Sequence, residues 1–304
     1  MQMHSNSRTL SIEFWLAEVR SEFESKAREL LPLFEVYAAE ALFGRRYIDA
    51  DLKGLNRPAR VIEIGAGSLL LSCQLMREGY EVTALEPTSL GFSHFTQMQL
   101  IILEKAGKLG CCPPIWDFPA ETLTDRSGFD YAFSINVMEH VENVALVIYN
   151  VGNSLAAGAV YRFTCPNYLF PYEPHFNIPT FFSKKMTEKM LGKRIFASQR
   201  VSDPNGTWQS LNWITVLQVR RIVRKLPWLK LSFNRMVLAL TLERIATDSI
   251  FAGRRSTFVR VFILTAVRSR VHNLLRLMPA ALQPVMDCRL EKTIVKEKVD
   301  LCPR

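Results

Sequence analysis

Residues 60–68 read Arg-Val-Ile-Glu-Ile-Gly-Ala-Gly-Ser, a short β-branched run that is followed at once by a glycine-rich turn. This pattern is typical of a buried strand that leads through a tight turn into a helix. We expect that helix over Leu69–Arg77, with Gly79 as its stop, and a second strand over Tyr80–Leu85. Strand, helix and strand in so short a stretch predict a βαβ unit, whose strands pair in parallel and place a ligand crevice at their carboxyl ends.

The alternation of strands and helices continues beyond this unit. Further helices are predicted near Phe92–Lys105 and over Val144–Ala156, with a turn at Ala157-Gly158, and further strands within Cys111–Leu123 and over Phe129–Ile135 and Val160–Thr164. An alternating pattern of this kind predicts an α/β fold, a Rossmann-like doubly wound and mostly parallel sheet.

The flanks of this core have a different character. Apolar residues at helical spacing in Ile12–Phe43 predict two amphipathic helices, which Pro32 separates. A loop rich in proline and aromatic residues follows at Pro166–Pro179, after which a helix is expected over Ile214–Leu226 and a strand over Leu229–Phe233. We therefore predict a helical N-terminal cover (1–50), a ligand-binding core (51–180), and a C-terminal region (181–304) that holds the rest of the sheet and basic helices.

Charge is distributed unevenly along the 304 residues. Residues 1–180 hold 14 Lys/Arg and 21 Asp/Glu, a balance of −7, whereas residues 181–304 hold 24 and 8, a balance of +16. A basic region favours a negatively charged partner, which here includes nucleic acid, an anionic membrane surface and an anionic small molecule.

The cysteines and the N-terminal sequence bear on the compartment. The six cysteines form no CxxC pair and no metal-finger spacing, so we predict no metal site. The chain shows no basic-then-apolar signal segment and no transmembrane helix is predicted. These features predict a cytoplasmic protein.

The glycine turn indicates which ligand the crevice takes. Gly65 and Gly67 bring backbone close to a ligand because glycine has no side chain. The dinucleotide fingerprint GxGxxG requires a glycine where this chain has Leu70, which disfavours nicotinamide and flavin cofactors. Glu63 lies near the end of the first strand, where its carboxylate binds a cationic ammonium directly or through water; the alternative is a carboxylate satisfied by nearby backbone.

A second carboxylate completes the pattern. Glu86 ends the second strand, 19 residues after Gly67, where it can accept hydrogen bonds from both hydroxyls of a ribose. An ammonium group and two free ribose hydroxyls are features of S-adenosylmethionine, so we expect this molecule as the cofactor.

Four sequence blocks, in matching order and spacing, resemble the class I S-adenosylmethionine-dependent methyltransferases. They are residues 61–67 (VIEIGAG), 85–87 (LEP), 120–123 (AETL) and 129–141 (FDYAFSINVMEHV). The resemblance implies that the glycine turn and Glu63 face the methionine part of the cofactor, that Ala120 gives its N–H to the adenine, and that Asn136 lies beside the amino-acid end. The implied cofactor site comprises Glu63, Gly65, Ala66, Gly67, Glu86, Pro87, Ala120, Glu121 and Asn136.

Two positions depart from the family pattern. Leu69 stands where many members carry a third glycine, which predicts a slightly altered packing of the turn. Pro119 stands where many members have an aspartate that accepts from the adenine amino group, so that contact is either missing or supplied by Asp117.

Methyl transfer to a hydroxyl also needs a group that removes a proton. His140 follows the fourth strand, and Glu173 and His175 lie in the loop after the fifth strand. These three residues are our candidates for catalysis, because imidazole removes protons near pH 7. The structural alternatives are that His140 caps or packs the following helix and that the 166–179 loop is a lid.

Sequence motifs bear on two of the anionic partners, nucleic acid and a membrane surface. The Asp/Asn/Ser-Pro-Pro-aromatic tetrad of nucleobase amino-methyltransferases is absent after the fourth strand, which disfavours nucleic acid. Residues 254–282 alternate apolar clusters with arginines, a pattern that fits either an anionic membrane surface or packed helices with a charged outer face.

The sequence therefore predicts a methyltransferase that transfers a methyl group to oxygen of a small or glycosylated, anionic acceptor. One alternative is an enzyme that acts on a membrane-associated quinone or a lipid-linked acceptor. Another is a non-catalytic methyltransferase-like domain that serves as a binding module or scaffold. No protein partner is predicted.

Overall fold

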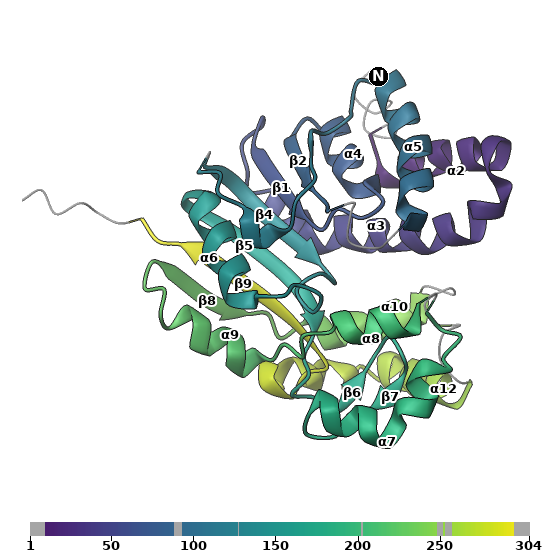
Figure 1. Cartoon of the computed structure of the whole chain (residues 1–304), viewed down its shortest axis with the longest axis vertical. Helices are drawn as coiled ribbons and strands as arrows, with labels where there is room; N and C mark the ends of the chain where they lie inside the picture. The colour runs from purple at the N-terminus through teal and green to yellow at the C-terminus, as the bar shows by residue number, and fades with distance from the viewer. Residues whose placement is uncertain are drawn as a thin grey trace, which may run out of the picture. The chain divides into compact units, whose positions relative to one another are not determined.

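A computed structural model describes residues 10–87, 93–126, 128–201, 203–247, 252 and 257–294 of the chain (Figure 1). The chain divides into two compact units. The first comprises Met1–Ile135, Leu146–Tyr161 and Lys292–Arg304, and the second comprises Asn136–Ala145 and Arg162–Glu291. The predicted division at residues 50 and 180 stays a prediction.

A seven-stranded sheet runs through the fold. Its strands are β1 (Arg60–Ile64), β2 (Glu81–Leu85), β3 (Ile115–Trp116), β4 (Phe129–Ile135), β5 (Leu155–Pro166), β8 (Leu229–Phe233) and β9 (Val285–Lys292). They lie in the order β3-β2-β1-β4-β5-β9-β8. β1 pairs in parallel with both β2 and β4, and β2 pairs in parallel with β3. The order reverses beside β1, so the predicted doubly wound, mostly parallel α/β fold is confirmed.

Helices surround the strands of the first unit. They are α2 (Ile12–Lys26), η1 (Arg28–Leu30), α3 (Leu31–Leu52), α4 (Leu70–Arg77), α5 (Ser93–Lys108), η2 (Ala120–Thr122) and α6 (Val144–Ser154). The two N-terminal helices were predicted, but the break between them was not placed correctly. It lies at Ala27, whereas Pro32 sits in the first turn of α3. Proline is tolerated there because the N–H groups of a first turn have no partner within the helix.

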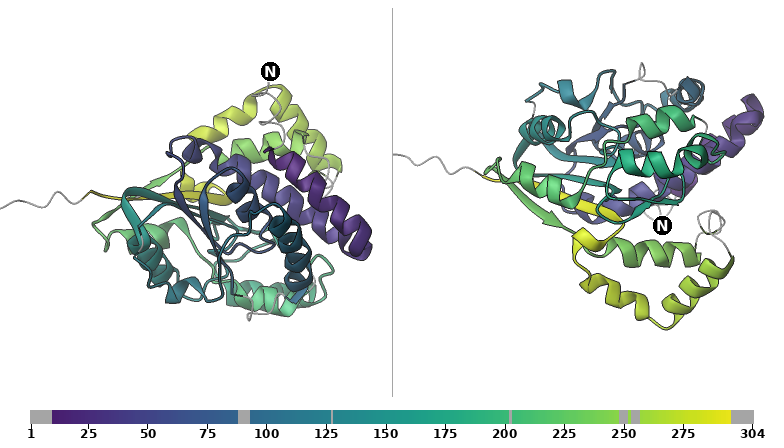
Figure 2. Two further views of the ribbon diagram at one scale, coloured as in Figure 1. Left: turned by 90° about the horizontal axis from the view of Figure 1, so that it is seen from above. Right: turned by 60° about the horizontal axis from the view of Figure 1, so that its bottom comes forward.

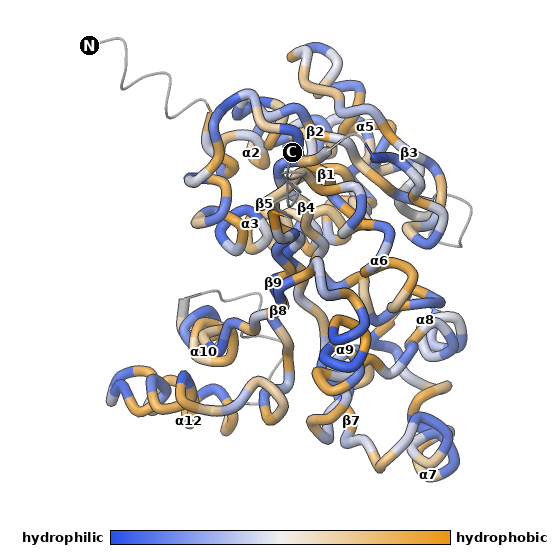
Figure 3. Tube along the Cα trace, turned by 90° about the vertical axis from the view of Figure 1, so that its left-hand side faces the viewer, coloured by the Kyte–Doolittle hydropathy of each residue, from blue (hydrophilic) through white to orange (hydrophobic). Residues whose placement is uncertain are grey.

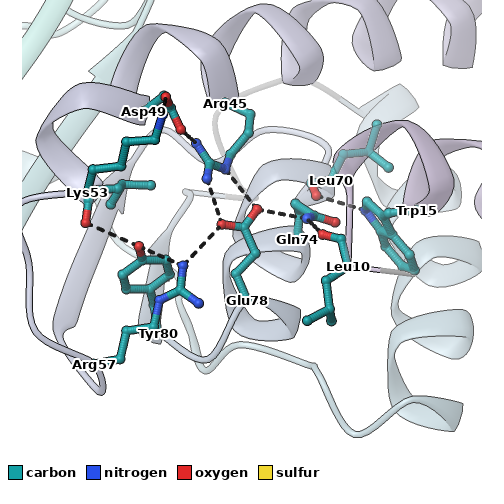
Figure 4. A network of polar contacts seen from close by, with 11 residues as sticks. Leu10, Trp15, Arg45, Asp49, Lys53, Arg57, Leu70, Gln74, Glu78 and Tyr80 are labelled. Carbon is teal, nitrogen blue, oxygen red and sulfur yellow. Dashed lines mark hydrogen bonds and ion pairs between the residues drawn. The ribbon is translucent and has the colours of Figure 1, made fainter. Parts of the chain in front are cut away.

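A polar network fixes the N-terminal helices against α4, the helix that follows the glycine turn (Figure 4). The guanidinium of Arg45 donates to both carboxylate oxygens of Glu78, each at 2.8 Å. The indole N–H of Trp15 donates to the carbonyl of Leu70 in the first turn of α4, at 3.0 Å. Because Trp15 is fully buried, this hydrogen bond lies in the core, where it fixes the first turn of α4 to α2.

Strand β5 begins earlier than the sequence predicts. It starts at Leu155, so the predicted turn at Ala157-Gly158 lies inside the strand. Gly158 has a φ of 82°, a backbone conformation that glycine adopts at little cost. The glycine therefore accommodates a local distortion of a continuing strand rather than ending it.

The second unit contains a short hairpin and a set of helices. β6 (Tyr172–Glu173) pairs antiparallel with β7 (Ile178–Pro179) inside the predicted structured loop. The helical elements are α7 (Lys184–Phe196), α8 (Pro204–Ser210), α9 (Val216–Val223), α10 (Val237–Thr247), α12 (Thr257–Arg268), η3 (Val271–Leu277) and η4 (Ala280–Leu282). Helices α10 and α12 pack against each other (Figure 2). Among the described residues, no helix is long and apolar enough to cross a bilayer.

Candidate functional site

The glycine turn joins β1 to α4 in the first unit. Gly65 and Gly67 have φ values of 72° and 51°, and the N–H of Gly65 donates to the carbonyl of Leu85 at 2.8 Å. Leu69 also has a positive φ, 67°, which costs a residue with a side chain roughly 1–2 kcal/mol. Leu69 is completely buried, so apolar burial offsets that strain and a leucine keeps a backbone conformation that glycine ordinarily adopts.

A side chain of α5 helps to hold the glycine turn in place. Helix α4 begins at Leu70 without a side-chain cap at its N-terminus. From α5, the amide of Gln99 donates to the carbonyl of Gly67 at 2.6 Å. Gln99 was not identified from the sequence, because nothing in its local pattern distinguishes it from other polar residues of an amphipathic helix.

Glu86 lies at the carboxyl end of β2 and reaches the glycine turn. Its Oε2 accepts from the N–H of Gly67 at 2.8 Å. Burial raises the pKa of Glu86, the Gly67 N–H opposes that shift, and the charge of Asp117 adds to it. Asp117 follows β3. The carboxyl ends of β1, β2 and β3 therefore bring the glycine turn, Glu86 and Asp117 to the same edge of the sheet, as the sequence predicts for Glu86.

Tyr37 of α3, which was not identified from the sequence, interacts electrostatically with Glu86. Burial raises the pKa of Tyr37 to about 12, and the nearby charges of Glu40 and then Glu86 add to the shift. The electrostatic contribution places the phenol in the field of Glu86. An aromatic residue on an amphipathic helix is ordinarily a core residue, so the sequence carries no signal for this role.

Glu63 is buried beside the same turn. The hydroxyl of Ser72 in α4 donates to its Oε2. Burial raises the pKa of Glu63 to about 8, against the Ser72 hydrogen bonds and with a further contribution from the charge of Glu86. A buried carboxyl group of this kind gains strongly from a cationic ligand, because positive charge lowers the cost of ionising it.

The segment for which the family resemblance implies an adenine contact lies at η2, and that contact stays a prediction. Pro119 precedes η2, and Ala120 is buried at its start. The carbonyl of Glu121 accepts from the side-chain amide of Asn150 at 2.5 Å, which ties η2 to α6. Trp116 and Phe118 stack on each other with ring centroids 5.8 Å apart. Pro87 closes β2, and its role stays a prediction.

The remaining predicted residues belong to the second unit. Asn136 is the first residue after β4; its φ is 55°, and its N–H donates to the carbonyl of Thr164 at 2.8 Å. The left-handed conformation, which asparagine tolerates better than most residues, turns the chain out of the strand. The predicted contact of Asn136 with the cofactor stays a prediction.

Glu173 is fully buried and holds the hairpin loop together. Its Oε1 lies 2.6 Å from Nδ1 of His175 and accepts from the N–H of the same residue at 3.1 Å. Its Oε2 accepts from the N–H of Phe176 at 2.7 Å, and the Tyr168 hydroxyl donates to Oε1 at 3.3 Å. With so many donors around it, Glu173 orients His175 and is not placed as a proton acceptor itself.

His140 is held by the end of α8. Its Nδ1 lies 2.8 Å from the hydroxyl of Ser210, which donates its own proton to the carbonyl of Thr207 at 2.9 Å. The Ser210 oxygen is then an acceptor, so His140 carries its proton on Nδ1 and its lone pair on Nε2.

Burial lowers the pKa of His140 to about 4; the charges of His175 and Lys184 lower it further, and that of Glu173 opposes them. An imidazole with this pKa is neutral at pH 7 but holds a captured proton poorly. His140 is therefore better suited to donate a lone pair to a ligand than to act as a general base that keeps the proton.

The structure brings His140 and His175 together across 35 residues of sequence. Their rings meet edge to face, with centroids 5.4 Å apart. Glu139 joins them: one ligand atom from each of the three residues lies within 4.8 Å of those of the other two. Glu139 is fully buried and was not singled out from the sequence, although it adjoins His140.

The chain has relatives among known proteins, although no protein-family model matches it. The chain is 47% identical over 278 residues to two curated proteins of Mycobacterium tuberculosis, "Uncharacterized protein Rv1509" of strain ATCC 25618/H37Rv and "Uncharacterized protein MT1557" of strain CDC 1551/Oshkosh. The aligned region covers 91% of this chain and 94% of each relative.

Similar solved structures are more distant. Phosphoethanolamine N-methyltransferase 2 of Haemonchus contortus, in complex with phosphomonomethylethanolamine and S-adenosylhomocysteine, is 13% identical, with a TM-score of 0.46. The match covers 79% of this chain and 49% of that one, so this chain spans about half its length. The YcgJ protein of Bacillus subtilis is 11% identical over 82% of this chain and 99% of that chain, with a TM-score of 0.46. At this distance, the assignment of a function depends on the residues of this chain.

Proposed function

We propose that this chain, which belongs to the same family as the mycobacterial proteins Rv1509 and MT1557, is an S-adenosylmethionine-dependent methyltransferase. The observation that carries the proposal is a pair of buried carboxyl groups, Glu63 and Glu86, at the glycine turn between β1 and α4. One group suits a cation and the other suits a pair of hydroxyls. S-adenosylmethionine presents both kinds of partner.

The two carboxyl groups have separate tasks in this proposal. Glu86 already accepts from the Gly67 N–H through Oε2, and it accepts from the ribose hydroxyls of the cofactor as well. Glu63, whose pKa is raised to about 8, ionises when the ammonium group of the methionine moiety arrives, either directly or through water. Ala120 and Asn136 contact the adenine and the amino-acid end, respectively.

The reaction we propose is transfer to an oxygen of a small or glycosylated acceptor. The acceptor oxygen forms a bond to the methyl carbon, the carbon–sulfur bond breaks with its electron pair left on sulfur, and the hydroxyl proton passes to water. In this proposal the cluster of His140, His175 and Glu173 binds the acceptor hydroxyl, because the imidazole of His140 is neutral at pH 7 and Glu173 fixes the orientation of His175.

Label transfer tests this function. The purified protein is incubated with methyl-labelled S-adenosylmethionine and a fractionated extract of the cells that make it, and the water-soluble, lipid and nucleic-acid fractions are counted. We expect label in the water-soluble fraction with the wild type and with Glu81→Ala, a control that removes an exposed carboxylate from the same strand as Glu86. Glu86→Ala is expected to transfer none.

The outcomes separate the alternatives. Label in the nucleic-acid fraction would contradict the proposed acceptor class. Cofactor binding without label in any fraction would favour a non-catalytic domain that serves as a binding module or scaffold.

A second candidate function, methylation of a membrane-associated acceptor such as a quinone or a lipid-linked sugar, is favoured by the surface of α12. Phe258, Val261 and Phe262 lie at helical spacing, and Phe258 and Phe262 are 82% and 69% exposed. The opposite face packs through Ile263 against Ile245 of α10 and Ala252.

Basic residues accompany this apolar strip. Arg260 and Arg268 are exposed on the same helix, where hydrophilic and hydrophobic residues alternate along the trace (Figure 3). Apolar residues that insert, with arginines that meet lipid phosphates, are the features of a helix that lies on an anionic bilayer. Of the predicted 254–282 segment, Arg254, Arg255 and Ser256 lie outside the described residues.

Vesicle co-sedimentation tests the membrane contact. The wild type is expected to sediment with vesicles of anionic lipid at low salt and to be released by high salt. Replacing Phe258 and Phe262 by aspartate is expected to abolish sedimentation, whereas Phe182→Asp, which alters another exposed phenylalanine of the second unit, is expected to leave it unchanged. Failure of the wild type to bind anionic vesicles at low salt would reject this function.

A further inference from the structure

Three side chains of the second unit converge as metal ligands do. Glu139, His140 and His175 each offer one ligand atom, and these atoms lie within 4.8 Å of one another. Two imidazoles and one carboxylate make up a frequent ligand set of catalytic metal sites, which leave further coordination positions for water or substrate. The set is assembled from a turn after β4 and a loop after β5, so it is created by the fold.

We assign Nε2 of both imidazoles as the ligand atom, because Nδ1 of each ring is hydrogen-bonded. Nδ1 of His175 is engaged by the carboxylate of Glu173 at 2.6 Å, and Nδ1 of His140 is engaged by the Ser210 hydroxyl at 2.8 Å. A histidine that binds a metal commonly donates its other N–H to a carboxylate or another acceptor, which fixes the tautomer and strengthens the ligand. Each histidine here already has such a partner.

The backbone around Glu139 is braced as well. Asn212 donates through its N–H to the carbonyl of Glu139 at 2.8 Å, and through its side-chain amide to the carbonyls of Met138 and Val141 at 2.7 and 2.8 Å. Three bonds from one residue make the 138–141 turn rigid. A rigid turn supports a preorganised ligand set, because little backbone has to be ordered when the ion binds.

The surroundings favour a cation. Glu139 and Glu173 are both fully buried, and a buried carboxylate is costly without compensating positive charge. A divalent ion bound by Glu139, His140 and His175 would supply that positive charge.

We propose that Glu139, His140 and His175 bind one divalent transition-metal ion. Imidazole nitrogen with a single carboxylate suits zinc, cobalt, manganese, iron or nickel, whereas magnesium and calcium prefer sites made of oxygen ligands. The sequence shows no metal signal, because the third ligand is 35 residues from the second and no cysteine takes part.

The role of the ion in methyl transfer rests on the proposed function. The acceptor hydroxyl binds the metal, which lowers the pKa of that hydroxyl, and its proton leaves to water. The resulting oxygen anion forms the bond to the methyl carbon as the carbon–sulfur bond breaks and sulfur retains the electron pair. In the metal-bound protein, His140 and His175 are therefore ligands, and the metal rather than an imidazole makes the hydroxyl acidic.

Titration with cobalt(II) tests the site without any methyl acceptor. The protein is freed of tags and metals, and Cys112→Ser and Cys302→Ser are introduced so that thiolates at the exposed cysteine and in the C-terminal segment do not compete. We expect one cobalt ion per chain, with visible absorption bands typical of nitrogen and oxygen ligands. His175→Gln, which alters a side chain that is 25% exposed, is expected to weaken binding at least about 100-fold, and His140→Gln likewise.

His272 provides a matched control in the same unit. Its Nε2 lies 2.9 Å from Glu243 and its Nδ1 lies 3.2 Å from the carbonyl of Ala266, so it forms a histidine–carboxylate pair with both ring nitrogens engaged. His272→Gln is expected to leave the cobalt affinity unchanged. Circular dichroism and the thermal midpoint of each variant show whether it is folded.

Several results would overturn the proposal. They are no saturable cobalt binding by the wild type, unchanged affinity in folded His175→Gln, or an equal loss in His272→Gln. Cofactor binding is measured separately, in metal-free buffer. A protein that binds cobalt but no S-adenosylmethionine would contradict the proposed function and leave the metal site standing, and the reverse result would do the opposite.

Discussion

The two candidate sites of this chain are built in different ways. In the first unit, Glu63 lies on β1 and accepts from Ser72, nine residues along the chain, while Glu86 directly follows the parallel strand β2 and accepts from Gly67. In the second unit, the hydrogen bond between His140 and Ser210 joins residues 70 positions apart. The first site follows from local sequence and strand register, whereas the second exists only after the unit has folded.

The sites also differ in charge. The first presents two buried carboxyl groups with raised pKa values, which favours a ligand that brings positive charge and hydrogen-bond donors. The second presents two imidazoles beside buried carboxylates, which favours a metal ion and a hydroxyl group. The difference suggests that cofactor and acceptor recognition are separable by mutation.

The largest effect is expected from Glu86→Ala on cofactor affinity. The change removes the acceptor of the ribose hydroxyls and also the acceptor of the Gly67 N–H. Hydrogen bonds to a charged group contribute about 1.5–3 kcal/mol each, so we expect a loss of about 100-fold or more for S-adenosylmethionine by calorimetry. Cobalt binding should not change, and Glu81→Ala should bind the cofactor normally; an equal loss in both glutamate variants would remove Glu86 from the site.

Glu63→Gln is expected to alter the pH dependence of stability. Because burial raises the pKa of Glu63 to about 8 in the folded protein, the stability that its protonated form contributes is fully present below the unfolded-state pKa near 4.5 and is lost as the pH rises through 8. Relative to the variant, the wild type should lose up to about 1.4 kcal/mol of unfolding free energy per pH unit within this window.

Thermal unfolding of the two proteins at pH 5, 6, 7, 8 and 9 gives the comparison. The stability advantage of Glu63→Gln should grow from pH 5 to pH 8 and level off above pH 8. A constant difference at every pH would show that Glu63 is not perturbed by burial.

A smaller effect is expected from Glu173→Gln on the second site. The amide can still accept from the backbone of the hairpin loop, but it no longer places a negative charge against Nδ1 of His175. Loss of such an outer partner typically weakens metal binding about tenfold or somewhat more, so the cobalt affinity should fall about tenfold with the visible spectrum retained. A folded variant with unchanged cobalt affinity would make Glu173 a purely structural residue.

Much of the fold was predictable because local patterns determine it. β4 has the predicted bounds, Phe129–Ile135, since a β-branched and aromatic run between turns has few other solutions. Pro32 was misread because proline both starts and breaks helices, and β9 was missed because residues 285–292 mix polar and apolar residues without a clear alternation. Its place beside β5 depends on contacts distant in sequence.

The two sites differ in the same way, because local sequence predicts the first and tertiary packing creates the second. Glu63 and Glu86 were predictable because strand ends and glycine turns carry a recognisable spacing. His140 and His175 were each singled out, but their meeting, the part played by Glu139 and the bond to Ser210 depend on tertiary packing. Tyr37 and Gln99 look like ordinary helix residues in the sequence, and only the fold brings Tyr37 under the charge of Glu86 and lets Gln99 donate to Gly67.

Calorimetric titration of the wild type with S-adenosylmethionine at pH 7, in two buffers of different ionisation enthalpy, tests the central claim most directly. We predict one cofactor per chain, a dissociation constant between about 1 μM and 1 mM, and a heat that differs between the buffers because Glu63 releases a proton on binding. Absence of binding up to about 1 mM, or binding that Glu86→Ala leaves intact, would contradict the account.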